Sequence, residues 1–260
     1  MSVLDRFRLD GKRAVVTGSS RGLGHAMAMA LAEAGADIVL VARPSPALDS
    51  AAEAVCALGR ACWALPADLA SPEAAADVCA RALKETGGVD ILINNVGGRR
   101  ENVPVEAQAL DDWRRLVDLN LTSAVACTRV IGGAMIGTGR SGRIVNIASI
   151  NALVAGRGIA GRHYETAKAG LLQFTRSIAV DWAPHGITAN AICPGLFMTE
   201  PNRRWAQENP DIIDRMVSMI PLGHAGDPAE LGPLAVYLAS DASRFMTGAT
   251  LVVDGGYTCW

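Results

Sequence analysis

The feature that most constrains the fold is a regular alternation of short apolar segments with longer alanine-rich ones. Several of the short segments are apolar throughout, which is typical of strands covered on both faces. Strands that alternate with helices form a parallel sheet with right-handed crossovers. The sequence therefore predicts an α/β fold, a single-domain, Rossmann-type doubly wound parallel sheet of about seven strands.

The expected strands are residues 13–17, 37–42, 61–65, 90–93, 142–148, 186–192 and 250–254. The expected helices are residues 22–34, 46–58, 71–86, 107–137, 161–183 and 228–240. Segment 196–226 lies outside the alternation, and we expect it to be a partly helical excursion that carries specificity. No repeat, low-complexity segment or linker divides residues 1–260, which predicts one domain.

A glycine-rich loop, "TGSSRGLG" at 17–24, follows the first expected strand and opens the first expected helix. Gly18 permits a tight turn, Gly22 lets the backbone approach a ligand, and Gly24 lets the helix pack closely on the sheet. The start of that helix offers free N–H groups to a pyrophosphate. Alone, the loop could be a tight turn without a ligand. Its place in a βαβ unit favours a dinucleotide site, although the spacing is not G-x-G-x-x-G.

Tyr164 and Lys168 lie four residues apart, on one face of an expected helix. A tyrosine can give a proton to a carbonyl oxygen, but a pKa near 10 makes it a poor base. A cation at ~4 Å, with an effective dielectric of about 20, stabilises a phenolate by roughly 4 kcal/mol. We therefore expect Lys168 to lower the pKa of Tyr164. A pair at this spacing is common by chance, so it gains meaning only from its surroundings.

Those surroundings resemble one family. The glycine loop, "NNVG" at 94–97, Ser149 and the Y-x-x-x-K motif occur in the order and approximate spacing of the short-chain dehydrogenase/reductase family. "CPG" at 193–195 and "VVDGG" at 252–256 also match. The resemblance extends from about residue 8 to the end of the chain. It implies an enzyme that transfers a hydride between a nicotinamide dinucleotide and a carbonyl or secondary alcohol.

The resemblance also implies residue roles. Tyr164 would exchange the proton, Ser149 would hydrogen-bond the substrate oxygen, Lys168 would also bind the nicotinamide ribose, and Asn120 would hold a water that links Lys168 to solvent. Asn94 and Gly97 resemble the turn beside the cofactor, with Val96 where alanine is usual. The residues implied to bind cofactor are Gly18, Ser20, Arg21, Gly22, Leu23, Gly24, Arg43, Asp68, Leu69, Asn95, Val96, Gly97, Tyr164, Lys168, Pro194, Gly195 and Thr199.

The choice of cofactor depends on the end of the second expected strand. An acidic residue there would bind the adenine ribose and repel a 2′-phosphate. This chain has Ala42 and then Arg43, and the glycine loop adds Arg21. Guanidinium groups suit phosphate geometry, which favours NADP(H) over NAD(H). Alternatively, both arginines are solvated surface charges.

The substrate is less constrained. Ser149 and Tyr164 are further apart than is usual in the family, which predicts a short insertion beside the substrate. If several basic residues converge, the substrate is anionic, either a sugar acid or an acyl group on a phosphopantetheine. The chain resembles sugar-acid and polyol members more, 3-oxoacyl thioester reductases remain an alternative, and a catalytically idle cofactor sensor or scaffold is a third. The basic residues are Arg99, Arg100, Arg157, Arg162, His163, Arg203 and Arg204.

Composition narrows the partners. A net charge of −2 gives no reason to expect nucleic acid or an anionic membrane. No apolar run approaches the roughly 20 residues of a membrane span, and the charged N-terminus does not resemble a secretory signal. The cysteines and histidines show no metal-ligand spacing. We expect a cytoplasmic protein with a small-molecule substrate and no metal. The resemblance implies a homotetramer or homodimer, formed through helices 107–137 and 161–183 and the last strand.

Overall fold

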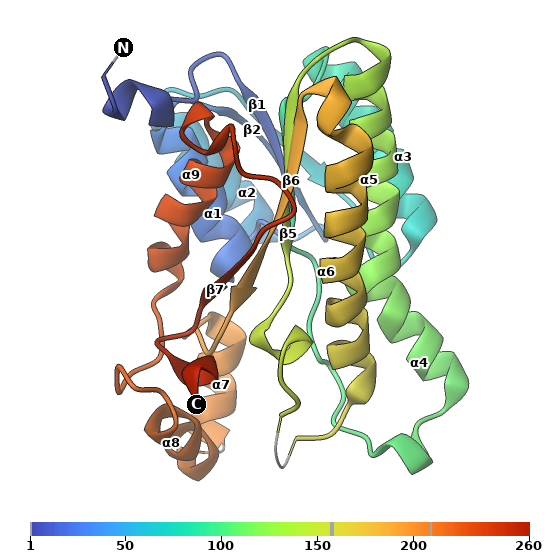
Figure 1. Ribbon diagram of the computed structural model, residues 1–260, viewed down its shortest axis with the longest axis vertical. Helices are drawn as coiled ribbons and strands as arrows, with labels where there is room; N and C mark the ends of the chain where they lie inside the picture. Colours follow the sequence, from blue (N-terminus) through green and yellow to red (C-terminus); the bar gives the residue numbers. More distant parts are fainter. Residues whose placement is uncertain (1, 157–158, 209) are drawn as a thin grey trace.

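The computed structural model describes residues 2–156, 159–208 and 210–260. Its centre is a seven-stranded sheet in the order β3-β2-β1-β4-β5-β6-β7, and every pairing is parallel (Figure 1). The strands are β1 Arg13–Thr17, β2 Asp37–Ala42, β3 Cys62–Pro66, β4 Ile91–Asn94, β5 Gly142–Ile147, β6 Ile187–Pro194 and β7 Thr250–Val253. The doubly wound fold is confirmed. Because the strand order reverses between β1 and β4, the crevice at their carboxyl ends is the expected ligand position.

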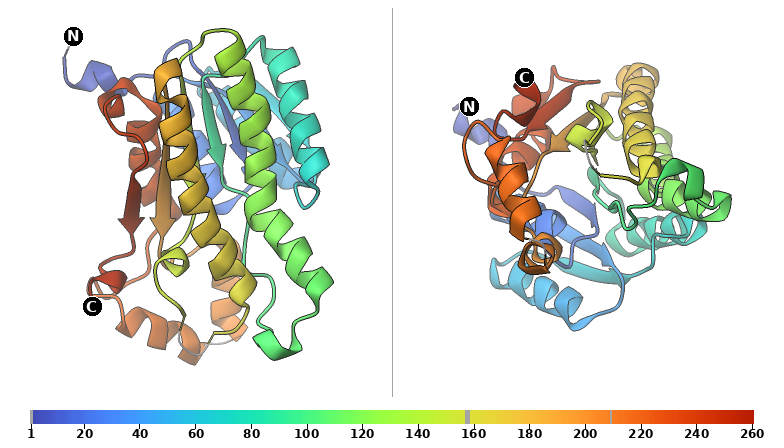
Figure 2. Two further views of the ribbon diagram at one scale, coloured as in Figure 1. Left: turned by 45° about the vertical axis from the view of Figure 1, so that its right-hand side comes forward. Right: turned by 90° about the horizontal axis from the view of Figure 1, so that it is seen from below.

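Helices cover both faces of the sheet, as two views at different angles show (Figure 2). One layer consists of α1 Gly22–Glu33, α2 Pro46–Ala57 and α9 Gly232–Ala239, and the other of α3 Pro72–Thr86, α5 Ser123–Gly137 and α6 Arg162–Trp182. Alternate residues of β1 divide between the two cores. Ala14 and Val16 pack in the first, whereas Val15 packs in the second. This alternation explains why the three central residues of the strand are all apolar.

The expected helix 107–137 is correct in place but wrong in detail. Val105–Ala107 forms a 3-10 turn, and the helix that follows is α4 Leu110–Val117, a π-helical turn at Asp118–Thr122, and then α5. A π turn takes up an extra residue and is frequent at functional sites. Here it contains Asn120, so the irregularity is at a predicted site residue.

The run Leu110–Gly137 also has the length and composition of a membrane span, and an 18-residue stretch within it has a mean hydropathy of 1.3. Half of that stretch is buried inside the molecule. A core helix of a globular protein meets the same criterion, and α5 packs closely on α3.

The excursion between β6 and β7 is partly helical, as expected. It contains α7 Glu200–Glu208 and α8 Pro210–Ser218, which lie together at one end of the molecule (Figure 1). The expected helix 228–240 begins as a 3-10 turn, Pro228–Leu231, and becomes α-helical only at Gly232. A capping box between Asp227 and Glu230 fixes that start.

Candidate active site

The glycine loop is a tight turn at the carboxyl end of β1. The Gly18 N–H donates to the carbonyl oxygen of Val41 at 2.7 Å, and Gly18 has a φ of +66°. A Cβ atom on Gly24 would lie 2.3 Å from the Gly18 oxygen, so only glycine fits there. The side-chain amide of Asn95 donates to the Thr17 oxygen at 2.9 Å and fixes the loop from the β4 side. The resulting loop can accept a dinucleotide, because no side chain of Gly18, Gly22 or Gly24 covers the backbone N–H groups where α1 begins.

The two asparagines of the "NNVG" motif have different positions. Asn95 holds the glycine loop, but Asn94 is buried and donates to Thr128 Oγ1 and to Asn146 Oδ1, both at 2.8 Å. Asn94 is therefore a core residue in this structure. At Gly97, a Cβ atom would lie 2.7 Å from the Asn120 Oδ1 atom and 3.0 Å from the Lys168 Nζ atom. Glycine at this position thus makes room for two of the predicted catalytic residues.

The four predicted catalytic residues come together at the carboxyl ends of β4 and β5. Asn120 accepts a hydrogen bond from the Gly98 N–H at 2.8 Å and donates to the Leu116 oxygen at 2.8 Å. The Lys168 ammonium lies 6.0 Å from the centroid of the Tyr164 ring. Ser149 follows β5, and its side chain is near enough to Tyr164 to lower the pKa of the phenol.

Burial dominates the electrostatics of this group. It raises the pKa of Tyr164, and the hydrogen bond with Ser149 and the charge of Arg99 act in the opposite direction without cancelling it. Burial also lowers the pKa of Lys168 to about 8. The Lys168 ammonium donates to the Ile147 carbonyl oxygen at 2.8 Å. Our expectation of a lowered Tyr164 pKa is therefore wrong for the protein without cofactor, because the loss of solvent around the ring outweighs the nearby charges.

One thiol lies at the centre of the site, a position that the sequence did not reveal. Cys193, at the end of β6, is fully buried and close enough to Tyr164 and Lys168 to affect their pKa values. Burial raises the pKa of the Cys193 thiol. Since reactivity requires the thiolate, this cysteine is an unreactive residue that lines the site.

The predicted cofactor residues lie along the same edge of the sheet. Asp68 follows β3 and caps the turn there by accepting from the Ala70 N–H at 3.0 Å. Thr199 precedes α7 and faces the glycine loop, since a Cβ on Gly22 would lie 3.4 Å from its methyl group. The other predicted residues in the loops of this edge are Ser20 and Leu23, which are half-buried, Leu69 and Pro194, which are buried, and Val96 and Gly195, which are half-buried.

Arg100, a candidate for binding an anionic substrate, lies near Arg43 and Arg21, two of the residues predicted to bind the cofactor. Its backbone has a φ of +62°, an uncommon conformation for a residue other than glycine. Burial lowers the pKa of Arg100, and the charges of Arg43 and Arg21 lower it further. These three guanidinium groups therefore share one region. Arg21 also pairs with Glu200 of α7 at 3.0 Å.

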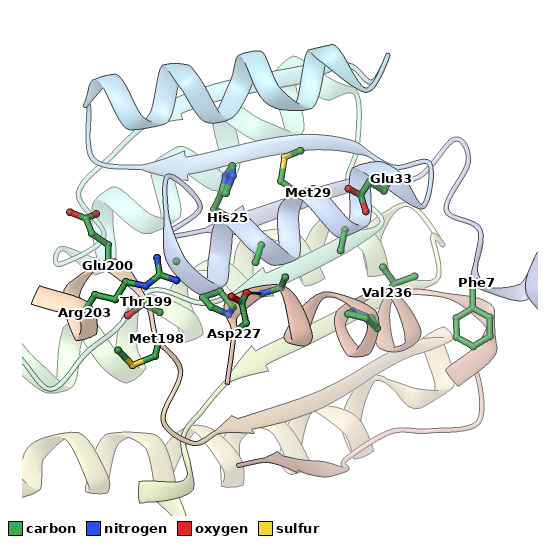
Figure 3. A pocket seen from close by; sticks show the side chains of 16 residues that line it. Phe7, His25, Met29, Glu33, Met198, Thr199, Glu200, Arg203, Asp227 and Val236 are labelled. Carbon is green, nitrogen blue, oxygen red and sulfur yellow. Dashed lines mark hydrogen bonds between the residues drawn. The ribbon is translucent and has the colours of Figure 1, made fainter. Parts of the chain in front are cut away.

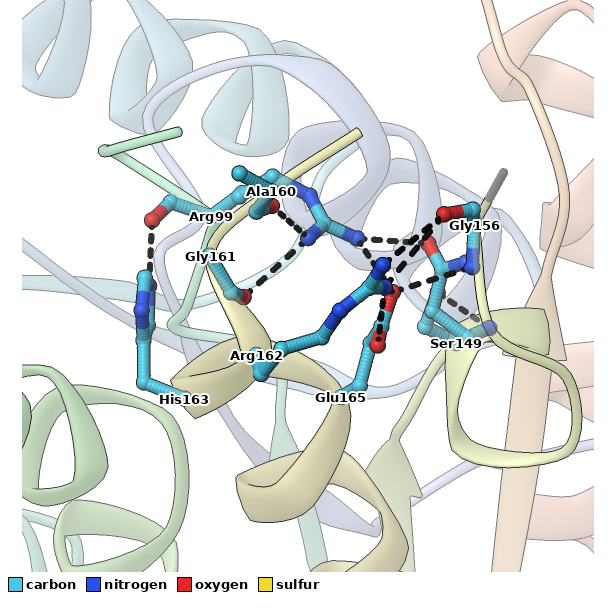
Figure 4. Close-up of polar contacts among 9 residues, drawn as sticks. Arg99, Ser149, Gly156, Ala160, Gly161, Arg162, His163 and Glu165 are labelled. Atoms are coloured by element: carbon cyan, nitrogen blue, oxygen red, sulfur yellow. Dashed lines mark hydrogen bonds and ion pairs between the residues drawn. The ribbon is translucent and has the colours of Figure 1, made fainter. Parts of the chain in front are cut away.

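The remaining basic residues do not converge on one point. Arg157 lies outside the described residues. Arg99 and Arg162 both contact Glu165, and His163 is fully buried, with its Nε2 atom 2.8 Å from the Arg99 oxygen (Figure 4). Arg203 and Arg204 are exposed on α7. The basic residues that the structure describes therefore do not form a single anion-binding cluster.

A groove of about 790 Å³ lies beside the site (Figure 3). Gly22 and Thr199 line one end, and Phe7 and Val236 line the other, between α1 and α9. Its lining does not include Tyr164, so the groove is separate from the predicted reaction centre. Among the described residues, no group of three or more His, Cys, Asp or Glu side chains is placed to hold a metal ion.

Comparisons with known proteins agree with this geometry. A family model described as enoyl-(acyl carrier protein) reductase matches residues 18–258. A crystal structure of a short-chain type dehydrogenase/reductase from Mycobacterium marinum is 35% identical, with a TM-score of 0.92 and full coverage of both chains. A gluconate 5-dehydrogenase from Burkholderia cenocepacia, solved in complex with NADP and tartrate, is 37% identical, with a TM-score of 0.91 and full coverage of both chains. A 3-oxoacyl-[acyl-carrier-protein] reductase from Synechocystis is 34% identical over 95% of this chain and 97% of its own.

Proposed function

The chain belongs to the short-chain dehydrogenase/reductase family, and from that premise we propose that it uses NADP(H) to interconvert a secondary alcohol and a carbonyl on a sugar acid or polyol. The observation that carries the proposal is the meeting of Ser149, Tyr164 and Lys168 beside a glycine loop shaped for a dinucleotide. All of these positions hold competent residues. This argues against an idle cofactor sensor.

In this mechanism Tyr164 is the proton donor and acceptor. When bound, the nicotinamide supplies or accepts the hydride. Because the pKa of Tyr164 is raised, the side chain is a neutral phenol at neutral pH and is ready to protonate a carbonyl oxygen. In the reverse direction it must lose its proton first, so alcohol oxidation should accelerate as the pH rises.

Ser149, Lys168 and Asn120 have supporting roles. The Ser149 hydroxyl oxygen accepts from the Asn151 N–H at 3.1 Å, which orients the hydroxyl so that its proton can face the substrate oxygen. Lys168 would bind the nicotinamide ribose and pass protons toward Tyr164. Its pKa of about 8 lets it both hold and release a proton near neutral pH. Asn120, fixed by three hydrogen bonds in the π turn, would hold the water that connects Lys168 to solvent.

The preference for NADP(H) rests on charge. Arg21, Arg43 and Arg100 share the region beyond the end of β2, and β2 ends in Ala42 rather than in an acidic residue. Guanidinium groups bind a charged 2′-phosphate more strongly than a neutral hydroxyl. The test is the ratio of kcat/KM for NADPH to that for NADH. We expect a ratio well above one, and a ratio below one would contradict this use of the arginines.

Two substrate classes compete. The gluconate 5-dehydrogenase relative was solved with tartrate, a small dicarboxylate, which supports a sugar-acid substrate. The Synechocystis relative supports the second candidate, a 3-oxoacyl thioester. The nicotinamide absorbance assay distinguishes them with gluconate-type acids, polyols and 3-oxoacyl thioesters. Turnover of the acids or polyols alone supports the proposal, and turnover of the thioesters alone supports the alternative.

We further propose a cytoplasmic homotetramer that works as one domain per chain. Exposed apolar side chains support the assembly: Val180 on α6 is 75% exposed, Trp260 at the chain end is 84% exposed, and Phe245 before β7 is fully exposed. Light scattering coupled to size-exclusion chromatography measures the mass directly. A homodimer is the alternative, and a monomer would refute the proposal.

A further inference from the structure

One half-buried arginine, Arg99, makes contacts with the segments before and after Tyr164. The Arg99 side chain is 16% exposed. Its Nη1 atom donates to the carbonyl oxygens of Ala160 at 2.6 Å and of Gly161 at 3.1 Å. Its Nη2 atom donates to Asn151 Oδ1 at 3.2 Å (Figure 4). With these donors engaged, Arg99 is poorly suited to bind an anionic substrate.

These bonds connect parts of the chain that must keep a fixed geometry. Asn151 belongs to the turn after β5, and its N–H donates to the Ser149 hydroxyl. Gly161 is the N-cap residue of α6, the helix that carries Tyr164. Arg99 itself follows β4. The guanidinium therefore links the Ser149 turn to the Tyr164 helix through the longer connection between them.

The same guanidinium lies over the Tyr164 ring, with 5.0 Å between its central carbon and the ring centroid. Its charge lowers the pKa of Tyr164, against the effect of burial. The other groups near the ring are Lys168 on the same helix and Cys193 on β6, which is a neutral thiol.

Glu165 completes the arrangement from the next position of α6. It accepts from Arg162 at 2.7 Å, from the Gly156 N–H at 3.0 Å and from Arg99 at 3.4 Å. Of these three charged side chains, only Arg99 affects the pKa of Tyr164. Glu165 therefore holds both arginines in place, while Arg99 supplies the charge that acts on the ring.

We propose that Arg99 is a positioning residue that ties the Ser149 turn to the Tyr164 helix and, through its charge above the ring, stabilises the Tyr164 phenolate. This inference rests on the proposed role of Tyr164 as the proton carrier. Arg162 provides the matched control, because it pairs with the same Glu165 but is bonded toward Gly156.

The test is a tyrosine titration by NMR, with ring-labelled tyrosines in the full chain. The chain has three tyrosines, and the Tyr164 signal is identified by its loss in Tyr164→Phe. A unit charge about 5 Å away, partly offset by Glu165, predicts that Arg99→Met shifts the Tyr164 titration up by about one pH unit. The pH profile of kcat/KM for oxidation should shift equally. Arg162→Met should shift both by clearly less.

A conservative variant separates the two parts of the proposal. Arg99→Lys keeps the charge but cannot make the forked bonds, so its titration should stay near that of the wild type while kcat and the melting temperature fall. Equal Tyr164 titrations in the wild type and Arg99→Met would refute the electrostatic part of the proposal. A fully active and fully stable Arg99→Lys would refute the part in which Arg99 links the Ser149 turn to the Tyr164 helix. If Arg99→Met does not fold, the test rests on Arg99→Lys. A Tyr164 titration that moves by about one pH unit in Arg99→Lys would overturn the proposal, because this variant keeps the charge. Because the titration needs no turnover, an inactive protein whose Tyr164 still shifts would count against the proposed function alone.

Discussion

Lys168 is predicted to destabilise the fold that it serves. Its side chain is 3% exposed, and burial lowers its pKa from 10.5 to about 8. At 1.36 kcal/mol per pH unit, this change in pKa corresponds to about 3 kcal/mol, which is the cost of keeping the ammonium charged in the protein interior. Lys168→Met removes that cost. It also removes the hydrogen bond to the Ile147 oxygen, worth about 1 kcal/mol. We therefore expect the cofactor-free variant to be more stable by about 2 kcal/mol at pH 7.

The pH dependence of the unfolding free energy tests whether the charged Lys168 destabilises the fold. Between pH 8 and 10.5 the unfolded lysine still binds its proton while the folded one has released it, so the unfolding free energy of the wild type rises with pH. Lys168→Met lacks this rise, and its advantage should vanish by about pH 10. Urea unfolding followed by circular dichroism, at pH 7 and 9.5 and one protein concentration, measures both effects. Lys84→Met, at an exposed site on α3, is the control. A variant less stable than the wild type at pH 7, or a difference independent of pH, would refute the reasoning.

Three further substitutions test other parts of the structure. Gly24→Ala places a Cβ 2.3 Å from the Gly18 oxygen, so the glycine loop must open. We expect the affinity for NADPH, measured by fluorescence titration, to fall at least about tenfold. An unchanged affinity would contradict the role of the loop in cofactor binding. Arg43→Asp should lower the NADPH/NADH ratio of kcat/KM by about tenfold or more, through repulsion of the 2′-phosphate; an unchanged ratio would remove Arg43 from the site. Gly132→Ala places a methyl group 2.3 Å from the Trp182 ring, so we expect the free energy of unfolding, measured with urea, to fall by about 1–3 kcal/mol. A neutral or stabilising effect would show that α5 and α6 can move apart to make room for the methyl group.

The sequence predicted the sheet and its helical layers because those depend on local patterns. A strand with an apolar centre, such as residues 14–16 of β1, requires cover on both faces. The Asp227 cap marks a helix start by chemistry that is local to it. The π turn at Asn120 escaped prediction, since an extra residue within a turn leaves no mark in an apolar pattern. The two asparagines after β4 were also not separable, because their roles depend on which way each side chain points.

The candidate site was predictable in membership and not in energetics. Tyr164 and Lys168 could be proposed from their spacing and Ser149 from the family resemblance. The balance between burial and charge at Tyr164 depends instead on packing against segments that are distant in the sequence. Arg99 illustrates the limit. Its position after "NNVGG" made it one candidate for binding an anionic substrate, whereas its donors are used by a loop more than fifty residues away in the sequence. The glutamate directly after Tyr164 was the one available signal of that network.

The measurement that tests the account most directly is kcat of Tyr164→Phe beside that of the wild type, on a substrate found in the absorbance assay. The substitution removes one hydroxyl and leaves the ring contacts with Arg99 and Lys168 in place. We predict a loss of about 10²–10⁴-fold in kcat, the usual contribution of a positioned proton donor, with NADPH affinity unchanged. A variant that turns over at the wild-type rate would contradict the assignment of the proton to Tyr164, and with it the proposed mechanism.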